Sequence, residues 1–303
     1  MIKSFEDVLK IAKERGPKTV AVACAQDVDV LMAVESARKE GIVKGILVGD
    51  GAAIKVIADD KGIDLNNFEV IDLPDLAEAS LKAVELVSTG KAHMVMKGLV
   101  DTAIILKAVL NKEVGLRTGN VLSHVAVFDL PAYHKLLLIT DAAMNIAPDL
   151  NAKKQIIENS LAVANGLDIE EPKVAVVCAK EKVNPKMPAT VDAGELVKMN
   201  EEGTLSGCLV GGPFALDNAV SKEAAKLKKI DHPVAGDADI LMCPNIESGN
   251  IAYKALTFLI NGSKSAGIIV GAKAPVVLTS RADDEETKLN SIALGTLMAA
   301  KMQ

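Results

Sequence analysis

Ser280 and Arg281 are the pair of residues in this chain whose types and position are best suited to chemistry. They follow the apolar, strand-like run of residues 275–279 and precede four acids, residues 283–286, that open a helical pattern. A guanidinium can hold a phosphate through two parallel hydrogen bonds, which a lysine cannot do, and a helix N-terminus also attracts anions. The sequence therefore predicts an anion site at this pair. A helix cap beside a solvated cation is the alternative that the pattern leaves open.

Several other polar residues also follow apolar, strand-like runs. In an α/β protein the carboxyl ends of parallel strands meet at one edge of the sheet, where ligands usually bind. We therefore expect candidate site residues at these strand ends, which are Gln26, Lys97, Asp141, Asn245 and Ser280. At Asp141 the pattern leaves two interpretations open, a helix cap or a catalytic carboxylate, and the cap is favoured.

The usual fingerprints of nucleotide and metal sites do not occur in the sequence. Neither Gly-x-Gly-x-x-Gly nor the P-loop pattern is found. The four cysteines lack the short spacing of zinc sites, and the four histidines show no ligand spacing. His124, beside Ser123 in a strand-like run, is interpreted as a structural histidine with its hydrogen bonds satisfied. We thus predict no metal site.

The composition narrows the class of partner. Of the 303 residues 50% are hydrophobic but only 2% are aromatic, and the formal net charge is −6. Few rings argue against carbohydrate or single-stranded nucleic-acid binding, and the acidic balance argues against a general nucleic-acid partner or an anionic membrane. No apolar run reaches membrane-spanning length, and the N-terminus does not read as a signal peptide. The dispersed cysteines fit buried thiols, so we expect a cytoplasmic protein.

Strand-like and helix-like patterns alternate along almost the whole chain, which predicts an α/β protein with mainly parallel sheets and flanking helices. The run of residues 141–148 interrupts this alternation and suggests a division there. The expected strands are 19–25, 44–48, 93–96, 121–128, 135–140, 173–179, 207–210, 239–243, 267–270 and 275–279. The expected helices are one capped by Asp27 or Asp29 and running to 39, 76–88, one opening at 101 or 102, 149–165, 188–201, 215–228, one capped by Ser248 and running to 259, and 283–301.

A set of short motifs, in order and at characteristic spacings, resembles the phosphate acetyl/butyryltransferase family over the whole length. Within it, the resemblance is closer to the butyryltransferases than to the acetyltransferases. The motifs are VMKG (95–98) with Thr102, GLRTG (115–119) with SHV (123–125), Thr140 and Asp141 with Asn145 and Pro148, NPKMP (184–188), GP (212–213) with LD (216–217), NIESGN (245–250), and VLTSRAD (277–283).

The resemblance implies a two-domain fold like that of isocitrate and isopropylmalate dehydrogenases. The expected domains are residues 1–141 plus 267–303, and 142–266, with the active site in the cleft between them. The implied reaction is reversible transfer of a butyryl group between coenzyme A and phosphate. The CoA thiol attacks acyl phosphate directly in a ternary complex, so no nucleophilic triad is expected, and CoA serves as a substrate rather than as a permanently bound cofactor.

The same resemblance implies roles for individual residues. Ser280 and Arg281 match the Ser-Arg pair that contacts the phosphoryl group and the reacting centre. In the acetyltransferases a Gly follows this pair and an Asp seven residues after the Ser is the proposed base. Here Ala282 and Thr287 stand at those positions, so Asp283 and Glu286 become the candidate bases. The residues expected to bind phosphate or CoA are Lys97, Thr102, Lys107, Arg117, Ser123, Asp141, Asn145, Asn245 and Asn250.

Three alternatives stay open beside the butyryltransferase hypothesis. One is an acetyltransferase, or an enzyme with broad short-chain acyl specificity. Another is an NAD- and metal-dependent hydroxyacid dehydrogenase of the same fold, although no Asp-x-x-x-Asp pair on one helix supports it. A third is an inactive regulatory domain, against which the intact Ser280-Arg281 pair argues. We expect small-molecule substrates, no nucleic-acid or membrane partner, and a homo-oligomer.

Overall fold

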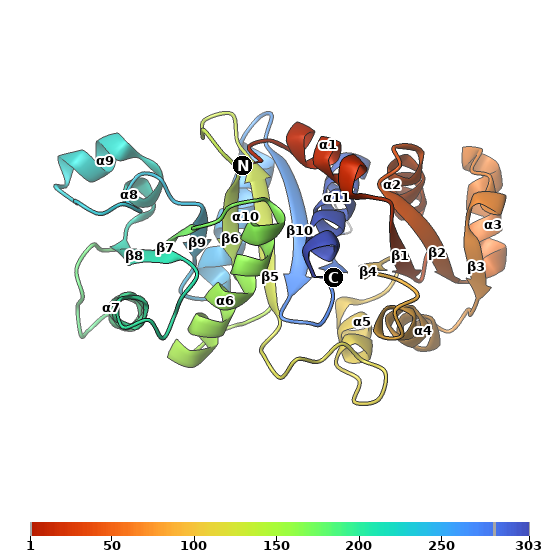
Figure 1. Cartoon of the computed structure of the whole chain (residues 1–303), viewed down its shortest axis with the longest axis horizontal. Coiled ribbons are helices and arrows are strands. Elements are labelled where there is room, and N and C mark those ends of the chain that lie inside the picture. The colour runs from red at the N-terminus through yellow and green to blue at the C-terminus, as the bar shows by residue number, and fades with distance from the viewer. Residues whose placement is uncertain (1, 281–282, 303) are drawn as a thin grey trace. The chain divides into compact units, whose positions relative to one another are not determined.

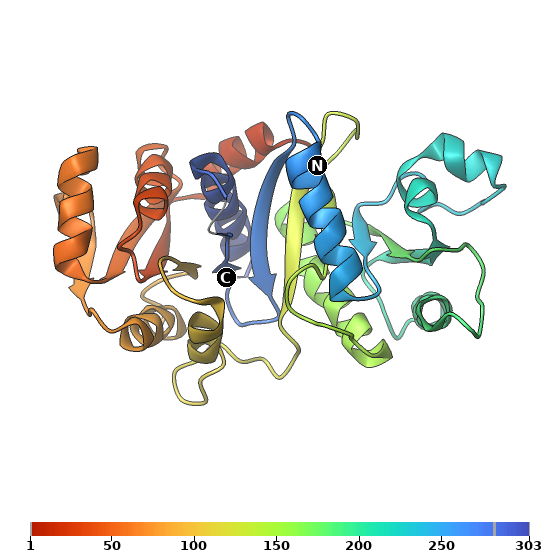
Figure 2. The same ribbon diagram turned by 180° about the vertical axis from the view of Figure 1, so that it is seen from behind.

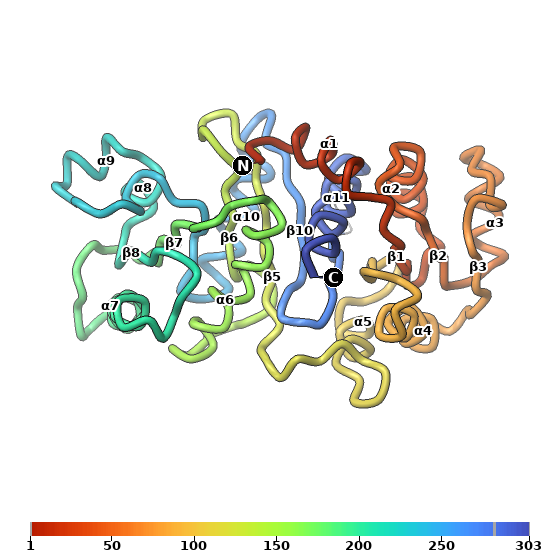
Figure 3. Tube along the Cα trace, viewed as in Figure 1, coloured from red at the N-terminus to blue at the C-terminus, as the bar shows by residue number. Residues whose placement is uncertain are grey.

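The computed structural model describes residues 2–280 and 283–302, which form two compact units. The terminal unit comprises Phe5–Asn120 and Ala266–Gln303, and the central unit comprises Val121–Ser265 with Met1–Ser4. The N-terminal and C-terminal segments of the chain therefore belong to the same unit. Helix α11 (Glu285–Lys301) packs against α1 (Phe5–Arg15), as the red and blue tubes in Figure 3 show. The expected domains, 1–141 plus 267–303 and 142–266, stay a prediction.

The described residues of the terminal unit form six strands in the order β3-β2-β1-β4-β11-β10. Figure 1 labels all of them except β11. The strands β1 (Lys18–Ala23), β2 (Val43–Gly49), β3 (Glu69–Asp72), β4 (Met94–Lys97) and β11 (Val276–Val277) run parallel to their neighbours in this order, and β10 (Lys264–Val270) is antiparallel to β11. The other helices of this unit are α2 (Val28–Lys39), α3 (Gly51–Lys61), α4 (Leu76–Ser88) and α5 (Thr102–Val109), and a 3₁₀ turn spans Leu65–Asn67.

The central unit contains five strands in the order β5-β6-β9-β7-β8. The first two, β5 (Ser123–Asp129) and β6 (Leu137–Thr140), are antiparallel, and β9 (Ile240–Met242), β7 (Lys173–Val177) and β8 (Leu209–Phe214) follow in parallel. Its helices are α6 (Leu150–Gly166), α7 (Pro188–Glu201), α8 (Leu216–Val220), α9 (Lys222–Leu227) and α10 (Ile246–Leu259). Helix α10 packs against β6, as Figure 2 shows.

The predicted class is confirmed: the chain is α/β, with mostly parallel strands and flanking helices. The low aromatic content is compatible with a dense core because aliphatic residues fill it, and Val20, Val22, Leu47 and Ile105 are all fully buried. In the part of the chain that the structure describes, no helix has both the length and the apolar character needed to cross a bilayer.

Several predicted element boundaries are wrong. The single helix expected over 215–228 is two helices, because Ser221 is extended and its hydroxyl accepts the Ala224 N–H at the start of α9. Helix α10 starts at Ile246, since Asn245 rather than Ser248 is its N-cap. The strand expected over 275–279 is ladder-paired only at Val276 and Val277. Strand β3 and the helices α1 and α3 were not predicted; β3 is short and mostly exposed, which hides its strand character.

Candidate active site

One group of predicted site residues meets at the carboxyl ends of two neighbouring strands in the terminal unit. Val276 lies opposite Val95 and Val277 opposite Met96 in the parallel β11–β4 pair, so the next residues, Leu278 and Lys97, also come side by side. Around them is a cavity of about 310 Å³, here called the Ser280 pocket. Its lining residues are Lys97, Val100, Asp101, Thr102, Leu278, Thr279 and Ser280.

Lys97 is held on one side of this pocket by the loop that follows β4. Its side chain is buried, and its ammonium donates to the carbonyl oxygens of Gly98 and Val100, both at 3.2 Å. The same loop is fixed to β1 through the Gly98 N–H, which donates to the Ala23 carbonyl at 2.8 Å. A Cβ at Gly98 would lie 2.2 Å from the Cys24 carbonyl oxygen, so only glycine fits here. The positive charge of Lys97 is therefore fixed in place before any ligand arrives.

Thr102 is the first residue of α5, so the N-terminus of this helix opens at the Ser280 pocket. The exposed N–H groups and the helix dipole there favour a negatively charged ligand. Asp101 lines the same pocket and is the N-cap residue of α5, without a capping side-chain hydrogen bond. The described lining thus combines an ammonium, three hydroxyl-bearing residues and a helix N-terminus with one carboxylate.

Two hydrogen bonds link Ser280 to Asp283. The Ser280 N–H donates to the Asp283 carboxylate at 2.7 Å, and the Asp283 N–H donates to the Ser280 carbonyl at 3.1 Å. The buried ammonium of Lys288 donates to the Asp283 carbonyl. Arg281, together with Ala282, lies outside the described residues. The Asp283 carboxylate is therefore engaged by the backbone of the residue that it was expected to assist.

The other expected residues of this unit do not line the Ser280 pocket. Lys107 is exposed in the last turn of α5, and Glu286 is exposed in the first turn of α11. Arg117 is exposed and belongs to an isolated bridge with Ala272. Their contacts with phosphate or CoA stay a prediction.

A second group of predicted residues meets at the carboxyl ends of the strands in the central unit. Asp141 directly follows β6 and is buried, and its carboxylate accepts four hydrogen bonds. The donors are the N–H groups of Ala143, Met144 and Asn145, at 2.9 to 3.0 Å, and the Asn145 side-chain amide at 2.6 Å. These contacts organise the loop after β6 but cap no helix among the described residues, since the next helix, α6, has Asp149 as its N-cap. The helix-cap interpretation of Asp141 is therefore wrong. The Asn145 amide also donates to the Leu122 carbonyl at 2.8 Å.

Asn245 and Asn250 lie on either side of the N-terminus of α10, close to the same loop. The Asn245 side chain accepts the Ser248 N–H at 3.0 Å, and the Asn250 amide donates to the Ala142 carbonyl at 3.1 Å. Between them, Gly249 lets α10 approach the loop, because a Cβ there would lie 2.2 Å from the Asp141 carbonyl oxygen. Both asparagines therefore help to build this end of the central unit.

The side chains of the neighbouring residues Ser123 and His124 differ in whether they have hydrogen-bond partners. The buried Ser123 hydroxyl accepts the Asn159 amide at 3.0 Å. His124 is also buried, but its Nδ1 has no hydrogen-bond partner among the described residues, so its interpretation as a satisfied histidine is wrong. Burial lowers the pKa of His124 to about 4, opposed by the charge of Asp141 and assisted by that of Lys254.

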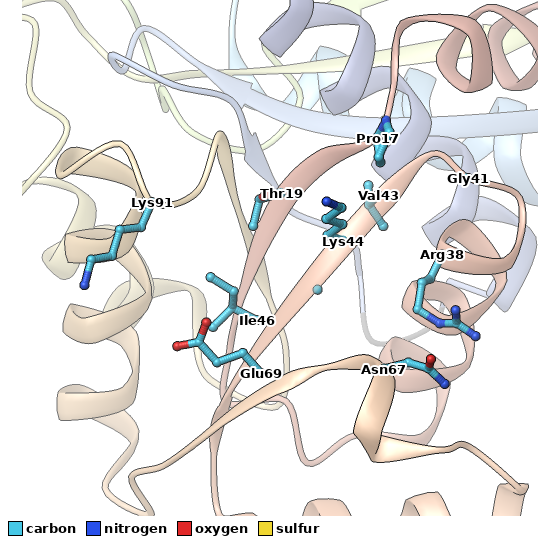
Figure 4. A pocket seen from close by; sticks show the side chains of 11 residues that line it. Pro17, Thr19, Arg38, Gly41, Val43, Lys44, Ile46, Asn67, Glu69 and Lys91 are labelled. Carbon is cyan, nitrogen blue, oxygen red and sulfur yellow. The ribbon is translucent and has the colours of Figure 1, made fainter.

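A larger cavity of about 580 Å³ lies elsewhere in the terminal unit (Figure 4). Its lining includes Arg38, Lys44, Glu69 and Lys91. Thr19, Lys44 and Glu69 belong to the amino-terminal parts of β1, β2 and β3, away from the strand ends where ligands of open α/β sheets usually bind. Arg38 is occupied by a bidentate contact with Glu35, at 2.7 and 3.0 Å. Size alone therefore does not favour this cavity as the active site.

Comparison with known proteins assigns the chain to a family. Residues 4–79 and 75–296 match the model of the family described as phosphate acetyl/butaryl transferase. The chain belongs to the phosphate acetyl/butyryl transferase family. It is 56% identical to a phosphate butyryltransferase of Clostridium acetobutylicum, over 99% of each chain, and 48% identical to a phosphate acetyltransferase of Thermotoga maritima, over 97% of this chain and 99% of that protein.

The chain is also similar to a phosphotransacylase whose crystal structure has been solved. The crystal structure of a branched-chain phosphotransacylase from Enterococcus faecalis V583 matches with a TM-score of 0.83 and 38% identity, over 93% of this chain and 99% of that one. The resemblance inferred from the sequence is thereby confirmed at the level of the family.

Some residues of the Ser280 pocket in this family member were missed by the sequence analysis. Val100, Asp101, Leu278 and Thr279 all line the pocket. Each lies within three residues of a predicted site residue, but the sequence does not tell which neighbours of Lys97 and Ser280 face the same space. In the described residues no group of three or more His, Cys, Asp or Glu side chains could hold a metal ion.

Proposed function

We propose that this protein transfers a butyryl group reversibly between coenzyme A and inorganic phosphate. The observation that carries the proposal is the Ser280 pocket, in which Lys97, Thr102 and Ser280 come together in a chain of this family. The identity of 56% to a phosphate butyryltransferase supports the butyryl group as substrate. The identity of 48% to a phosphate acetyltransferase favours acetyl as a second substrate, so related short acyl groups are candidates too.

The chemistry requires two polyanions to be held together while charge develops on a carbonyl oxygen. When the CoA thiol attacks butyryl phosphate, a sulfur–carbon bond forms, the carbon–oxygen bond to phosphate breaks, and the thiol proton passes to a base. Orientation of the two substrates can supply much of the rate, and hydrogen-bond donors at the developing oxyanion supply more. We assign the phosphate to the Lys97 ammonium, the Ser280 hydroxyl and the N-terminus of α5, with the Arg281 guanidinium as a further donor.

The base for the thiol is proposed to come from the start of α11, where Asp283 and Glu286 are the candidates. The hydrogen bond from the Ser280 N–H to the Asp283 carboxylate, at 2.7 Å, favours a positioning role for Asp283. Glu286 is exposed in the first turn of α11, so its carboxylate is accessible to a substrate.

The remaining expected residues enter the proposal as contacts with phosphate or CoA. For Asp141, Asn145, Asn245 and Asn250 the internal hydrogen bonds support a role in shaping the binding surface. Lys107 and Arg117, which are exposed, are proposed as direct contacts, whereas Ser123, which is buried and bonded to Asn159, is proposed to shape the surface from within. We further propose that CoA is a substrate without any permanently bound cofactor, that the protein is cytoplasmic and homo-oligomeric, and that its fold is of the isocitrate and isopropylmalate dehydrogenase type.

The test is phosphate-dependent release of free CoA from butyryl-CoA, followed with a thiol reagent. We expect release to need phosphate and to be faster with butyryl-CoA than with acetyl-CoA. Ser280→Ala should lose on the order of 10²-fold in turnover, as expected for one donor at the reacting centre, whereas Ser88→Ala, at the end of α4, should not. If no acyl-CoA shows phosphate dependence, the proposal is wrong, and turnover of NAD with a hydroxyacid would then favour the dehydrogenase alternative.

A further inference from the structure

The Ser280 pocket has an apolar part as well as the polar part assigned to phosphate. Val100 and Leu278 are its two aliphatic lining residues. Both lie within the same cavity of about 310 Å³ as Lys97, Thr102 and Ser280. An acyl phosphate has the same division, since an anionic phosphoryl group is joined through one carbonyl to an apolar chain. The pocket therefore matches both ends of such a substrate.

Leu278 is positioned by the strand pairing that also positions Lys97. It is the residue after β11, and the β4–β11 register brings it beside Lys97 at the strand ends. Leu278 is half-buried, so part of its side chain is available to a ligand. Only Thr279 separates it from Ser280. An acyl chain attached to a carbonyl near Ser280 would thus find Leu278 within a few bond lengths.

Val100 is fixed on the other side of the pocket by the loop after β4. Its carbonyl accepts the Lys97 ammonium at 3.2 Å, and its N–H donates to the Gly98 carbonyl at 2.9 Å. The preceding residue is tied to the residue that follows β1, because the Leu99 N–H donates to the Cys24 carbonyl at 2.8 Å. Val100 is only 2% exposed. A wall that is ordered before binding can discriminate between ligands by shape, since little of the binding energy is lost in ordering it.

We propose that Leu278 and Val100 contact the acyl chain and set its preferred length. This inference rests on the proposed function and assigns a place to one part of its substrate. In an apolar pocket one methylene changes selectivity by roughly 10- to 200-fold. Butyryl and acetyl groups differ by two methylenes, so an apolar pocket formed by these side chains can distinguish them.

The experiment measures kcat/KM for acetyl-, butyryl- and hexanoyl-CoA, with phosphate as co-substrate, in variants that change the pocket in opposite directions. Leu278→Phe should fill the pocket and lower the butyryl-to-acetyl ratio by about tenfold or more. Leu278→Ala and Val100→Ala should enlarge it and raise the hexanoyl-to-butyryl ratio by a similar factor. A thermal unfolding curve of each variant checks that the protein is folded.

Leu99→Ala is the matched control, because Leu99 belongs to the same loop, is 45% exposed and does not line the pocket. Its selectivity ratios should equal those of the unmodified protein. The inference is overturned if the unmodified protein is active and the ratios stay unchanged in the Leu278 and Val100 variants. If the unmodified protein itself shows no phosphate-dependent release of CoA, the proposed function is wrong, and the inference about the acyl chain is wrong with it.

Discussion

Asp283 shows how a single hydrogen bond changes the interpretation of a carboxylate. From the sequence Asp283 was a candidate base, because it lies three residues after Ser280. The position seven residues after Ser280, where an Asp would be expected, is occupied by Thr287. In the structure its carboxylate accepts the Ser280 N–H at 2.7 Å, and its own N–H returns a bond to the Ser280 carbonyl. A base that must take a proton from a thiol would have to do so while keeping this contact. The geometry therefore favours Asp283 as the residue that holds Ser280 in place.

This role predicts different results for two substitutions of Asp283. Asp283→Asn keeps an oxygen that can accept the Ser280 N–H, so turnover should fall by no more than about tenfold and the pH profile should keep its shape. Asp283→Ala removes the acceptor of the Ser280 N–H, so Ser280 can shift; a displacement of about 1 Å at the reacting centre can cost roughly 10²-fold. The measurement is kcat as a function of pH, by phosphate-dependent CoA release.

Glu286→Gln provides the comparison for these variants. If Glu286 is the base, this substitution should lower kcat and flatten the limb of the pH profile that the base produces. A flattened limb in Asp283→Asn, with an unchanged profile in Glu286→Gln, would contradict the positioning role and assign the proton transfer to Asp283.

At the scale of elements, the close approach of α10 to the loop after β6 depends on one glycine. A Cβ at Gly249 would lie 2.2 Å from the Asp141 carbonyl oxygen and 3.1 Å from the Ala142 Cα. These are backbone atoms, which a small side-chain rotation cannot move away. Gly249→Ala should therefore destabilise the protein by about 1–3 kcal/mol, as overpacking usually does. Urea unfolding, followed by circular dichroism, measures the loss.

Gly194→Ala in α7 is the matched helical control. A Cβ there meets only a terminal methyl of Val183, at 2.9 Å, and this side chain is exposed and can rotate. Alanine is the better helix former by about 1 kcal/mol, so this variant should be as stable as the unmodified protein or more so. Equal stability losses in the two variants would show that the contact with the Asp141 carbonyl is not the cause.

The sequence predicts elements best where a local contact defines them. A helix was expected to open at Asp27 or Asp29 and another at Asp149. In the structure the Asp27 and Asp149 side chains accept a backbone N–H at the starts of α2 and α6. At α10 both Asn245 and Ser248 are good caps, and only the fold decides that Asn245 is extended while Ser248 is already helical. The break at Ser221 is likewise invisible, because the residues on both sides suit a helix.

At the scale of the molecule, the missing information is long-range pairing. The sequence indicated that Lys97 and Ser280 lie at strand ends: Lys97 is the last residue of β4, and Ser280 lies three residues beyond the end of β11. It could not show that β11 lies beside β4, since the two strands come from distant parts of the chain and the pairing leaves no local pattern. The same limit applies to His124, whose unsatisfied Nδ1 depends on the side chains that happen to surround it. The sequence could thus predict individual candidate residues of the site, but it could not predict which of them lie close together in the structure.

A cluster of charges lies at the amino ends of the strands in the central unit, and we expect it to make the stability of the protein depend on pH. The Asp237 carboxylate contacts the Lys173 ammonium at 2.5 Å, the His134 ring at 2.8 Å and the Lys135 ammonium at 3.3 Å. Burial raises the pKa of Asp237, but the hydrogen bond from Lys173, the charge of Lys135 and the bond to His134 outweigh it and lower the pKa to about 2.

Because the folded pKa of Asp237 lies below the value of about 3.9 in an unfolded chain, this carboxylate stabilises the folded state above pH 4. The contribution should disappear as the pH falls from about 4 to 2, where the unfolded chain takes up the proton first. Asp237→Asn should therefore be less stable at pH 7 and lose less stability over that range, as measured by urea unfolding at each pH. Asp59→Asn, at an exposed site on α3, should keep the steeper dependence of the unmodified protein, and an equally steep loss in Asp237→Asn would rule out this cluster as the cause.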